Sequence, residues 1–171
     1  AGYDFGAGWS MLAKRYGFAL LMPEQRGGNN ANTCFNWFNP GDVARGRGEA
    51  GSIRQMIARM VTDHSIDPSR IFITGLSAGG AMAAVLASAY PDLYAALGVH
   101  SGLAVGSAHD VQSAFAAMQG TPAARSAVWK RISKSVPAIV FHGDRDTTVH
   151  PRNGEQVILE SVDPGAASSV E

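Results

Sequence analysis

A serine near the middle of the chain has the neighbours that a catalytic nucleophile needs. The pentapeptide Gly75-Leu76-Ser77-Ala78-Gly79 fits the pattern Gly-x-Ser-x-Gly and follows the β-branched segment 70–74. A serine on a tight turn between a strand and a helix is strained, and the turn lifts its hydroxyl above the sheet edge. Gly75 and Gly79 are expected to give this turn room. The pattern therefore predicts that Ser77 is a nucleophile.

The residue after the serine is the candidate oxyanion donor. The backbone N–H of Ala78 would point at the developing oxyanion, beside the positive end of the following helix. The alternative interpretation is a plain Gly/Ser turn at a helix start, because the chain is rich in Gly and Ala. The preceding strand and the helix expected at 81–90 favour the nucleophile elbow that is typical of α/β-hydrolases.

A second group of polar residues, 142–151, follows a short apolar run. A carboxylate after such a strand could orient a histidine and stabilise its imidazolium form. The pattern His-Gly-x-x-Asp-x-x-Val selects Asp146 as this acid. Asp144 would instead cap the turn or pair with Arg145. Both acids could also be ordinary solvated loop residues.

The histidines of the chain do not supply an evident base. In the order Ser, Asp, His, the base follows one further strand, and a parallel strand is reached only through a crossover of about a dozen residues. His150 follows Asp146 by four residues, so it belongs to the same loop. His64, at a helix end, is expected to be structural. His100 could line the site or make a structural hydrogen bond.

Strand-like and helix-like segments alternate along the chain. The expected strands lie within residues 18–23, 70–76, 95–102 and 136–143, where short apolar runs indicate burial. The expected helices lie within 8–17, 49–63, 81–90, 110–118, 121–133 and 151–161. This alternation predicts an α/β fold with a mostly parallel sheet and helices on both faces.

The segment 24–48 has no periodicity, and such long irregular segments are usually functional. It contains Phe35, Trp37 and Phe38. These rings could form the wall of a groove for an apolar or aromatic substrate group. They could equally pin the segment to the core.

The composition limits the possible partners. The 171 residues have a formal net charge of zero, 46% hydrophobic and 16% charged residues, which suits a single domain over 1–171. Zero net charge gives no support for nucleic acid or a membrane surface as partner, and no apolar run approaches the length of a membrane span. Cys34 is either a small buried residue or half of a disulfide.

The chain resembles the polyhydroxybutyrate depolymerase and feruloyl esterase branch of the α/β-hydrolases. The resemblance covers nearly the whole chain and rests on Gly8-Trp9, Pro23-Glu24-Gln25, Cys34-Phe35-Asn36-Trp37-Phe38, Gly46-Arg47-Gly48-Glu49, Asp67-Pro68-Ser69-Arg70, Thr74 to Met82, His100-Ser101-Gly102 and the loop from His142 to Pro151. It implies an α/β-hydrolase fold and a secreted serine esterase without metal or organic cofactor. It supports Ser77 as nucleophile and Asp146 as triad acid.

The resemblance also implies substrates and missing parts. A polyester such as polyhydroxyalkanoate is the expected substrate, with feruloyl or acetyl xylan esters as alternatives. Family members carry a His-Gly-Cys stretch upstream, which would supply a second oxyanion donor and a disulfide partner for Cys34. They carry the catalytic histidine downstream of Glu171, so the chain is expected to be truncated at both ends. The rival hypotheses are a non-catalytic polymer-binding module and a serine peptidase on the same fold.

Overall fold

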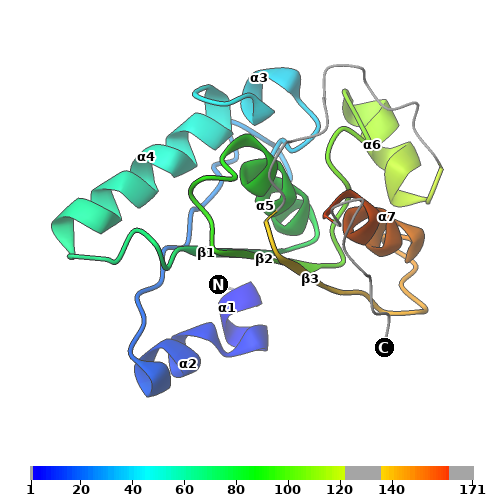
Figure 1. Cartoon of the computed structure of the whole chain (residues 1–171). Coiled ribbons are helices and arrows are strands. Elements are labelled where there is room, and N and C mark those ends of the chain that lie inside the picture. The colour runs from blue at the N-terminus through cyan, green and yellow to red at the C-terminus, as the bar shows by residue number, and fades with distance from the viewer. Residues whose placement is uncertain (1, 122–135, 162–171) are drawn as a thin grey trace.

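The computed structural model describes residues 2–121 and 136–161. In chain order the elements are α1 (Gly2–Ala7), α2 (Trp9–Tyr16), α3 (Pro40–Val43), α4 (Gly48–Asp63), β1 (Phe72–Leu76), α5 (Ala78–Ala89), β2 (Ala96–His100), α6 (Val111–Met118), β3 (Ala138–Phe141) and α7 (Arg152–Ser161). Helices α1 and α2 lie on one side of the sheet, and α3 to α7 lie on the other (Figure 1). The predicted α/β fold with helices on both faces is confirmed.

The sheet is parallel, with its strands in the order β1-β2-β3. Leu76 pairs with His100, and His100 pairs with Phe141, so the last residues of the three strands are aligned. Parallel strands end at the same edge of a sheet. The segments that follow β1, β2 and β3 therefore leave from one edge, and this edge contains the candidate site.

Helix α5 packs on β1 and β2 and supplies the centre of the core. Its residues from Gly80 to Ala87 are buried, and five of these eight are glycine or alanine. A Cβ atom built on Gly80 would lie 2.9 Å from the Gly75 carbonyl oxygen. Small side chains are therefore what allows α5 to lie this close to the sheet.

The buried Glu49 anchors the irregular segment 24–48 to the start of α4. Its carboxylate accepts hydrogen bonds from the Gln25 amide, from the Asn36 N–H at 2.8 Å and from Asn36 Nδ2 at 2.8 Å. Burial raises the pKa of Glu49, and these hydrogen bonds oppose the rise. The anchor explains how a segment with little regular structure keeps one conformation.

The prediction of a strand at residues 18–23 is wrong. The segment leaves α2 through Gly17, which has a φ of 70°, and runs on without regular structure. Phe18, Leu21 and Met22 are exposed. A strand is stabilised by ladder bonds to a neighbour, and this segment pairs with none of β1 to β3.

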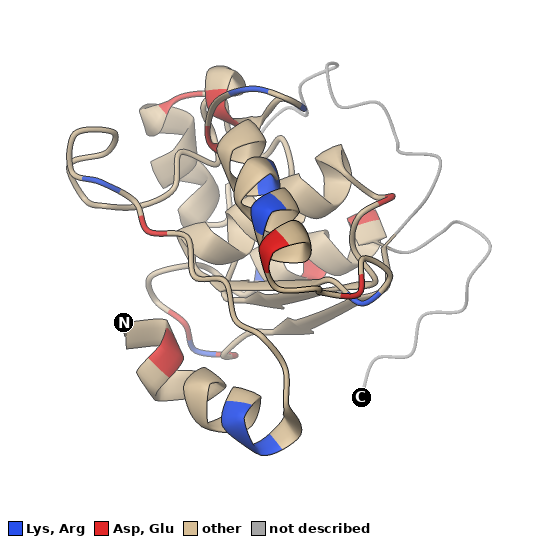
Figure 2. Cartoon of the chain, turned by 90° about the vertical axis from the view of Figure 1, so that its left-hand side faces the viewer, with Lys and Arg blue, Asp and Glu red and all other residues tan. Residues whose placement is uncertain are grey.

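The other expected elements are present within a few residues of their predicted bounds, except the helix at 121–133, which lies almost entirely outside the described residues. The short helices α1 and α3 were not predicted. Along the ribbon of the described residues, the positions of Lys and Arg are interspersed with those of Asp and Glu (Figure 2). In this part of the chain no helix is both long and apolar enough to span a membrane.

Candidate active site

Ser77 lies on a strained turn between β1 and α5. Its φ is 54° and its ψ is −122°, a region that residues with a Cβ seldom adopt. Two backbone bonds hold this conformation. The Ser77 N–H donates to the His100 carbonyl at 2.9 Å, and the Ser77 carbonyl accepts from the Ala81 N–H at 2.9 Å. The geometry is that of a nucleophile elbow.

The room for the turn comes from Gly75 and Gly80 rather than from Gly75 and Gly79. A Cβ built on Gly75 would lie 2.1 Å from the Gly79 carbonyl oxygen, so strand and helix meet backbone to backbone there. A Cβ on Gly79 would meet no atom of the described residues within 4 Å. The expectation for Gly79 was therefore wrong, since its own Cα faces open space.

Ala78 is the first residue of α5. The N–H groups of the first helical turn have no acceptor within their helix. The Ala78 N–H is thus available beside Ser77, at the positive end of a 12-residue helix. This placement agrees with the oxyanion role expected from the sequence, which stays a prediction.

Asp146 lies in a tight turn after β3 and is half-buried, with its side chain 20% exposed. Its Oδ1 accepts the N–H groups of Thr148 and Val149, both at 2.9 Å. These backbone bonds, the one from Val149 first, lower the pKa of Asp146, and the nearby Ser101 side chain lowers it further. Asp146 is therefore held in its ionised form.

Asp144 has a different environment. Its side chain is 94% exposed and lies 3.9 Å from the Arg145 guanidinium. A solvated pair of this kind cannot hold a carboxylate in one orientation. Of the two acids on the loop, only Asp146 is fixed by the fold, which supports its selection as triad acid.

Ser77 and Asp146 follow strands that are separated only by β2. Neighbouring strands lie about 4.8 Å apart, so the two strand ends are roughly 10 Å apart. One imidazole with a hydrogen bond of about 2.8 Å at each nitrogen spans most of such a gap. The separation of the two strand ends therefore suits one histidine between nucleophile and acid.

The residue His100 ends β2 beside the elbow. Its side chain is exposed, and its ring makes an edge contact with Phe141, with centroids 6.4 Å apart. In the described structure its imidazole has no hydrogen-bond partner, so the structural hydrogen bond expected as an alternative is not seen. A substrate-binding role for His100 stays a prediction.

His150 belongs to the turn that starts α7. Its Nδ1 accepts the Arg152 N–H at 3.2 Å, and its ring lies against Gly120, where a Cβ would be 2.8 Å from the His150 Cγ. His150 therefore packs against the end of α6, as expected for a residue that is not the triad base.

Trp37 lies in the core and is 6% exposed. Its ring packs edge-on against Phe38, with centroids 5.6 Å apart. Phe35 and Phe38 are half-buried against the same core. This burial favours the interpretation in which the rings pin the segment, and substrate binding by Trp37 stays a prediction.

Two residues at this edge were not identified from the sequence. Ser101 follows β2 with a φ of 47°, and its side chain lies close enough to Asp146 to lower the pKa of that carboxyl. His142 follows β3, and its Nε2 lies 3.6 Å from Asp146 Oδ2. Their positions directly after two of the strands were the signal that could have found them.

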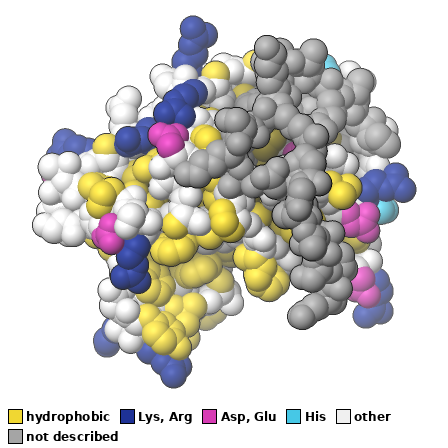
Figure 3. All heavy atoms as spheres, in the orientation of Figure 1, with side chains coloured by type: hydrophobic (Ala, Val, Ile, Leu, Met, Phe, Trp, Pro, Cys, Tyr) yellow, Lys and Arg dark blue, Asp and Glu magenta, His cyan; other side chains and the backbone are white. Residues whose placement is uncertain are grey.

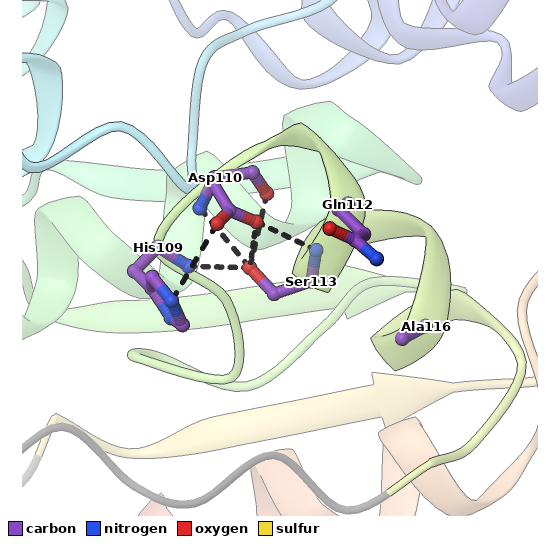
Figure 4. Close-up of a pocket in the computed structure, with 5 residues that line it drawn as sticks. All are labelled: His109, Asp110, Gln112, Ser113 and Ala116. Carbon is purple, nitrogen blue, oxygen red and sulfur yellow. Dashed lines mark hydrogen bonds and ion pairs between the residues drawn. The ribbon is translucent and has the colours of Figure 1, made fainter.

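A surface pocket lies elsewhere, at the start of α6 (Figure 4). His109, Asp110, Gln112, Ser113 and Ala116 line it. Asp110 and Ser113 use their polar atoms to cap the helix, because Asp110 Oδ1 accepts the Ser113 N–H at 2.7 Å. None of the candidate site residues contributes to this pocket.

No group of His, Cys, Asp and Glu among the described residues could hold a metal ion.

Comparison with known proteins shows that this chain is similar to esterases. The esterase PHB depolymerase family matches residues 2–162. Poly(3-hydroxyalkanoate) depolymerase C of Paucimonas lemoignei is 41% identical over 167 residues, which are 92% of this chain and 40% of that protein. A probable acetylxylan esterase A of Neosartorya fischeri is 30% identical and matches 88% of this chain and 44% of its own length. The chain thus spans less than half the length of these relatives.

A solved structure has a similar fold. The acetyl xylan esterase from Aspergillus awamori superposes with a TM-score of 0.68 at 24% identity. The match covers 87% of this chain and 59% of that one. The parallel sheet and its flanking helices therefore belong to the α/β-hydrolase type of fold that the sequence indicated.

Proposed function

Because the chain belongs to the esterase PHB depolymerase family, we propose that it is the part of a carboxylic ester hydrolase that carries the nucleophile and the triad acid. The observation that carries the proposal is the strained turn at Ser77 on the same sheet edge as the fixed carboxylate of Asp146. Strain at a residue with a Cβ persists where surrounding structure enforces it, and such sites are commonly functional.

The proposed reaction is a two-step acyl transfer. Ser77 Oγ attacks the ester carbonyl carbon while a histidine takes the hydroxyl proton. The Ala78 N–H stabilises the tetrahedral oxyanion, and Asp146 stabilises the imidazolium. The alcohol leaves with the proton from the histidine, and water then hydrolyses the acyl-enzyme by the same steps. We place this histidine outside residues 1–171, because His150 belongs to the loop of Asp146 and packs against α6.

For the substrate we propose a polyhydroxyalkanoate chain. The relative at 41% identity is a poly(3-hydroxyalkanoate) depolymerase, whereas the acetylxylan esterase is 30% identical. An acetyl or feruloyl ester of xylan is the alternative within the family. We also propose that the enzyme is secreted, as the resemblance to this family implies.

The test uses the full-length protein and a short-chain nitrophenyl ester. We expect Ser77→Ala to lower kcat by on the order of 10⁴-fold or more, because no other group can form the acyl-enzyme. Ser52→Ala, on the exposed side of α4, is the matched control and should leave kcat unchanged. Equal activity of Ser77→Ala and wild type would refute the proposal. Polymer binding without turnover by the wild type would favour the binding module, and turnover of peptides but not esters would favour the peptidase.

A further inference from the structure

His142 is a buried residue that the proposed mechanism does not use. It follows β3 directly, and its side chain is 8% exposed. Its Nε2 lies 2.8 Å from the carbonyl oxygen of Val149. That oxygen can only accept, so Nε2 must carry the proton and donate. The bond joins the two ends of the loop that carries Asp146.

The other side of the imidazole is enclosed by α7. Nδ1 is buried and has no hydrogen-bond partner within the described ranges. A Cβ built on Gly154 would lie 2.8 Å from this atom, so the helix backbone packs directly on the ring. Gly154 therefore leaves the space that the ring occupies. The helix and the Val149 carbonyl together allow the ring one orientation.

This orientation bears on the carboxylate of Asp146. Oδ1 of Asp146 is occupied by the N–H groups of Thr148 and Val149. Those two groups lie on the segment that His142 ties back to β3 through Val149. Oδ2 lies 3.6 Å from His142 Nε2, beyond the usual length of a hydrogen bond. Oδ2 is thus the oxygen that remains able to accept from a catalytic histidine.

We propose that His142 is a positioning residue that closes the Asp146 loop and so presents Oδ2 of the triad acid. The inference rests on the proposed function for its effect on catalysis, but the loop geometry can be tested without activity. Loss of the His142 N–H would release Val149, and with it the bonds that fix Oδ1.

The experiment compares His142→Leu with His142→Gln in the full-length protein. Leucine fills similar space without a donor, whereas glutamine keeps an N–H donor without a titratable ring. We expect His142→Leu to lower kcat by about 10²-fold with little change in KM, since small misplacements of catalytic groups have effects of this size. The acid limb of kcat/KM should move to lower pH, because a misplaced carboxylate stabilises the imidazolium less. His142→Gln should restore most of kcat.

A second readout does not depend on activity. NMR titration of the Asp146 carboxyl carbon should show its pKa rising toward the ordinary value in His142→Leu, because the bonds from Thr148 and Val149 are lost. Val157→Ala, in the core of α7, controls for a general loss of stability and should leave the titration and the pH profile unchanged. If Val157→Ala reproduced the effects of His142→Leu, the role would be only structural and the proposal overturned.

A third variant covers the case in which His142→Leu does not fold. Gly154→Ala favours the helix by about 1 kcal/mol but pushes against the ring. It should lower kcat and raise the pKa of Asp146. Unchanged kcat and titration in a folded variant would overturn the proposal. If the wild type were inactive on esters while the titration still responded, the proposed function would fail and the positioning role would stand.

Discussion

At the scale of single residues, the elbow depends on where a Cβ can and cannot be placed. Gly75 and Gly79 flank Ser77 symmetrically in the sequence, yet only at Gly75 would an added Cβ collide with the opposing element. The two glycines of the Gly-x-Ser-x-Gly pattern are therefore packed differently. The difference arises from the close approach of α5 to β1 and is not visible in the sequence pattern.

Alanine at these two glycines should therefore have opposite effects. We expect Gly75→Ala to lower the free energy of unfolding by at least ~3 kcal/mol, because its Cβ would overlap the Gly79 carbonyl. Gly79→Ala should raise it by up to ~1 kcal/mol through helix propensity. Urea unfolding of both variants measures the difference, and equal stability of the two would show that the elbow can open to admit a side chain.

Substitutions of the two acids of the loop, Asp146 and Asp144, should have different effects on kcat. Asp146→Asn keeps an oxygen for the N–H groups of Thr148 and Val149 but loses the acceptor for the catalytic histidine, so we expect kcat to fall by about 10⁴-fold. Asp144→Asn is the control and should stay within about twofold, since surface pairs contribute little. Steady-state kinetics on a nitrophenyl ester with the full-length protein decides between them.

The difference in the free energy of unfolding between wild type and Asp146→Asn should depend on pH with a defined sign. Backbone bonds, the one from Val149 first, lower the pKa of Asp146 in the folded state. The ionised carboxylate therefore stabilises the fold above the unfolded value of about 3.9, and this contribution is lost as pH falls through the folded pKa. Wild type and Asp146→Asn should differ most near neutral pH and converge in acid. A gap that widened in acid would contradict the assignment.

At the scale of elements, the sequence predicted best the elements with their own periodicity or a clear apolar run. Helix α4 lies within one residue of its expected start, and the strand before the elbow was recognised from its β-branched residues. The segment 18–23 has an equally apolar sequence but no neighbouring strand in the described sheet. Local pattern alone could not reveal the lack of a partner.

Some residues of the candidate site could likewise be predicted from the sequence, and others could not. Ser77 and Asp146 stand in recognisable local patterns, so both could be named from the sequence. The approach of the Ser101 side chain to Asp146 brings together loops after different strands, and the packing of His142 on Gly154 depends on α7. Such contacts follow from the order of the strands and from helix placement, which no short motif encodes.

The anchor of the irregular segment 24–48 gives a prediction at this scale. In Glu49→Gln, the amide NH₂ must face a donor in either orientation, because Asn36 and Gln25 present only N–H groups to this position. We expect a loss of about 1–3 kcal/mol in the free energy of unfolding. The exposed Glu24→Gln is the control. A Glu49→Gln variant as stable as wild type would show that the segment is held by Trp37 and its neighbours alone.

At the scale of the whole molecule, one face of the sheet carries exposed apolar side chains. Phe72, Leu76, Ile139 and Phe141 are between 40% and 65% exposed. They belong to the side opposite α5, where hydrophobic atoms gather in the lower part of the space-filling view, near α1 and α2 (Figure 3). A contiguous apolar surface of this kind favours association.

We therefore expect these 171 residues, expressed alone, to self-associate as their concentration rises and to bind a hydrophobic dye. Replacing Phe72 and Ile139 together by serine should reduce both effects, because the two side chains are among the most exposed of the sheet. Sedimentation velocity and dye fluorescence provide the measurement. Replacing Leu159, which is exposed on α7 away from this face, controls for general hydrophobicity. A monomer that binds no dye would show that the face is covered in solution.

The end of β2 is shared by the two halves of the site. The His100 carbonyl accepts the Ser77 N–H, and the next residue, Ser101, donates its N–H to the Phe141 carbonyl at the end of β3 and places its side chain near Asp146. The position of this strand end therefore sets the spacing between the nucleophile and the acid. The connection from α5 to β2, residues 90–95, lies at the opposite edge of the sheet, so its length is free of this constraint. Insertions or circular permutation in residues 90–95 should be tolerated. An insertion between His100 and Ser101 should not be tolerated.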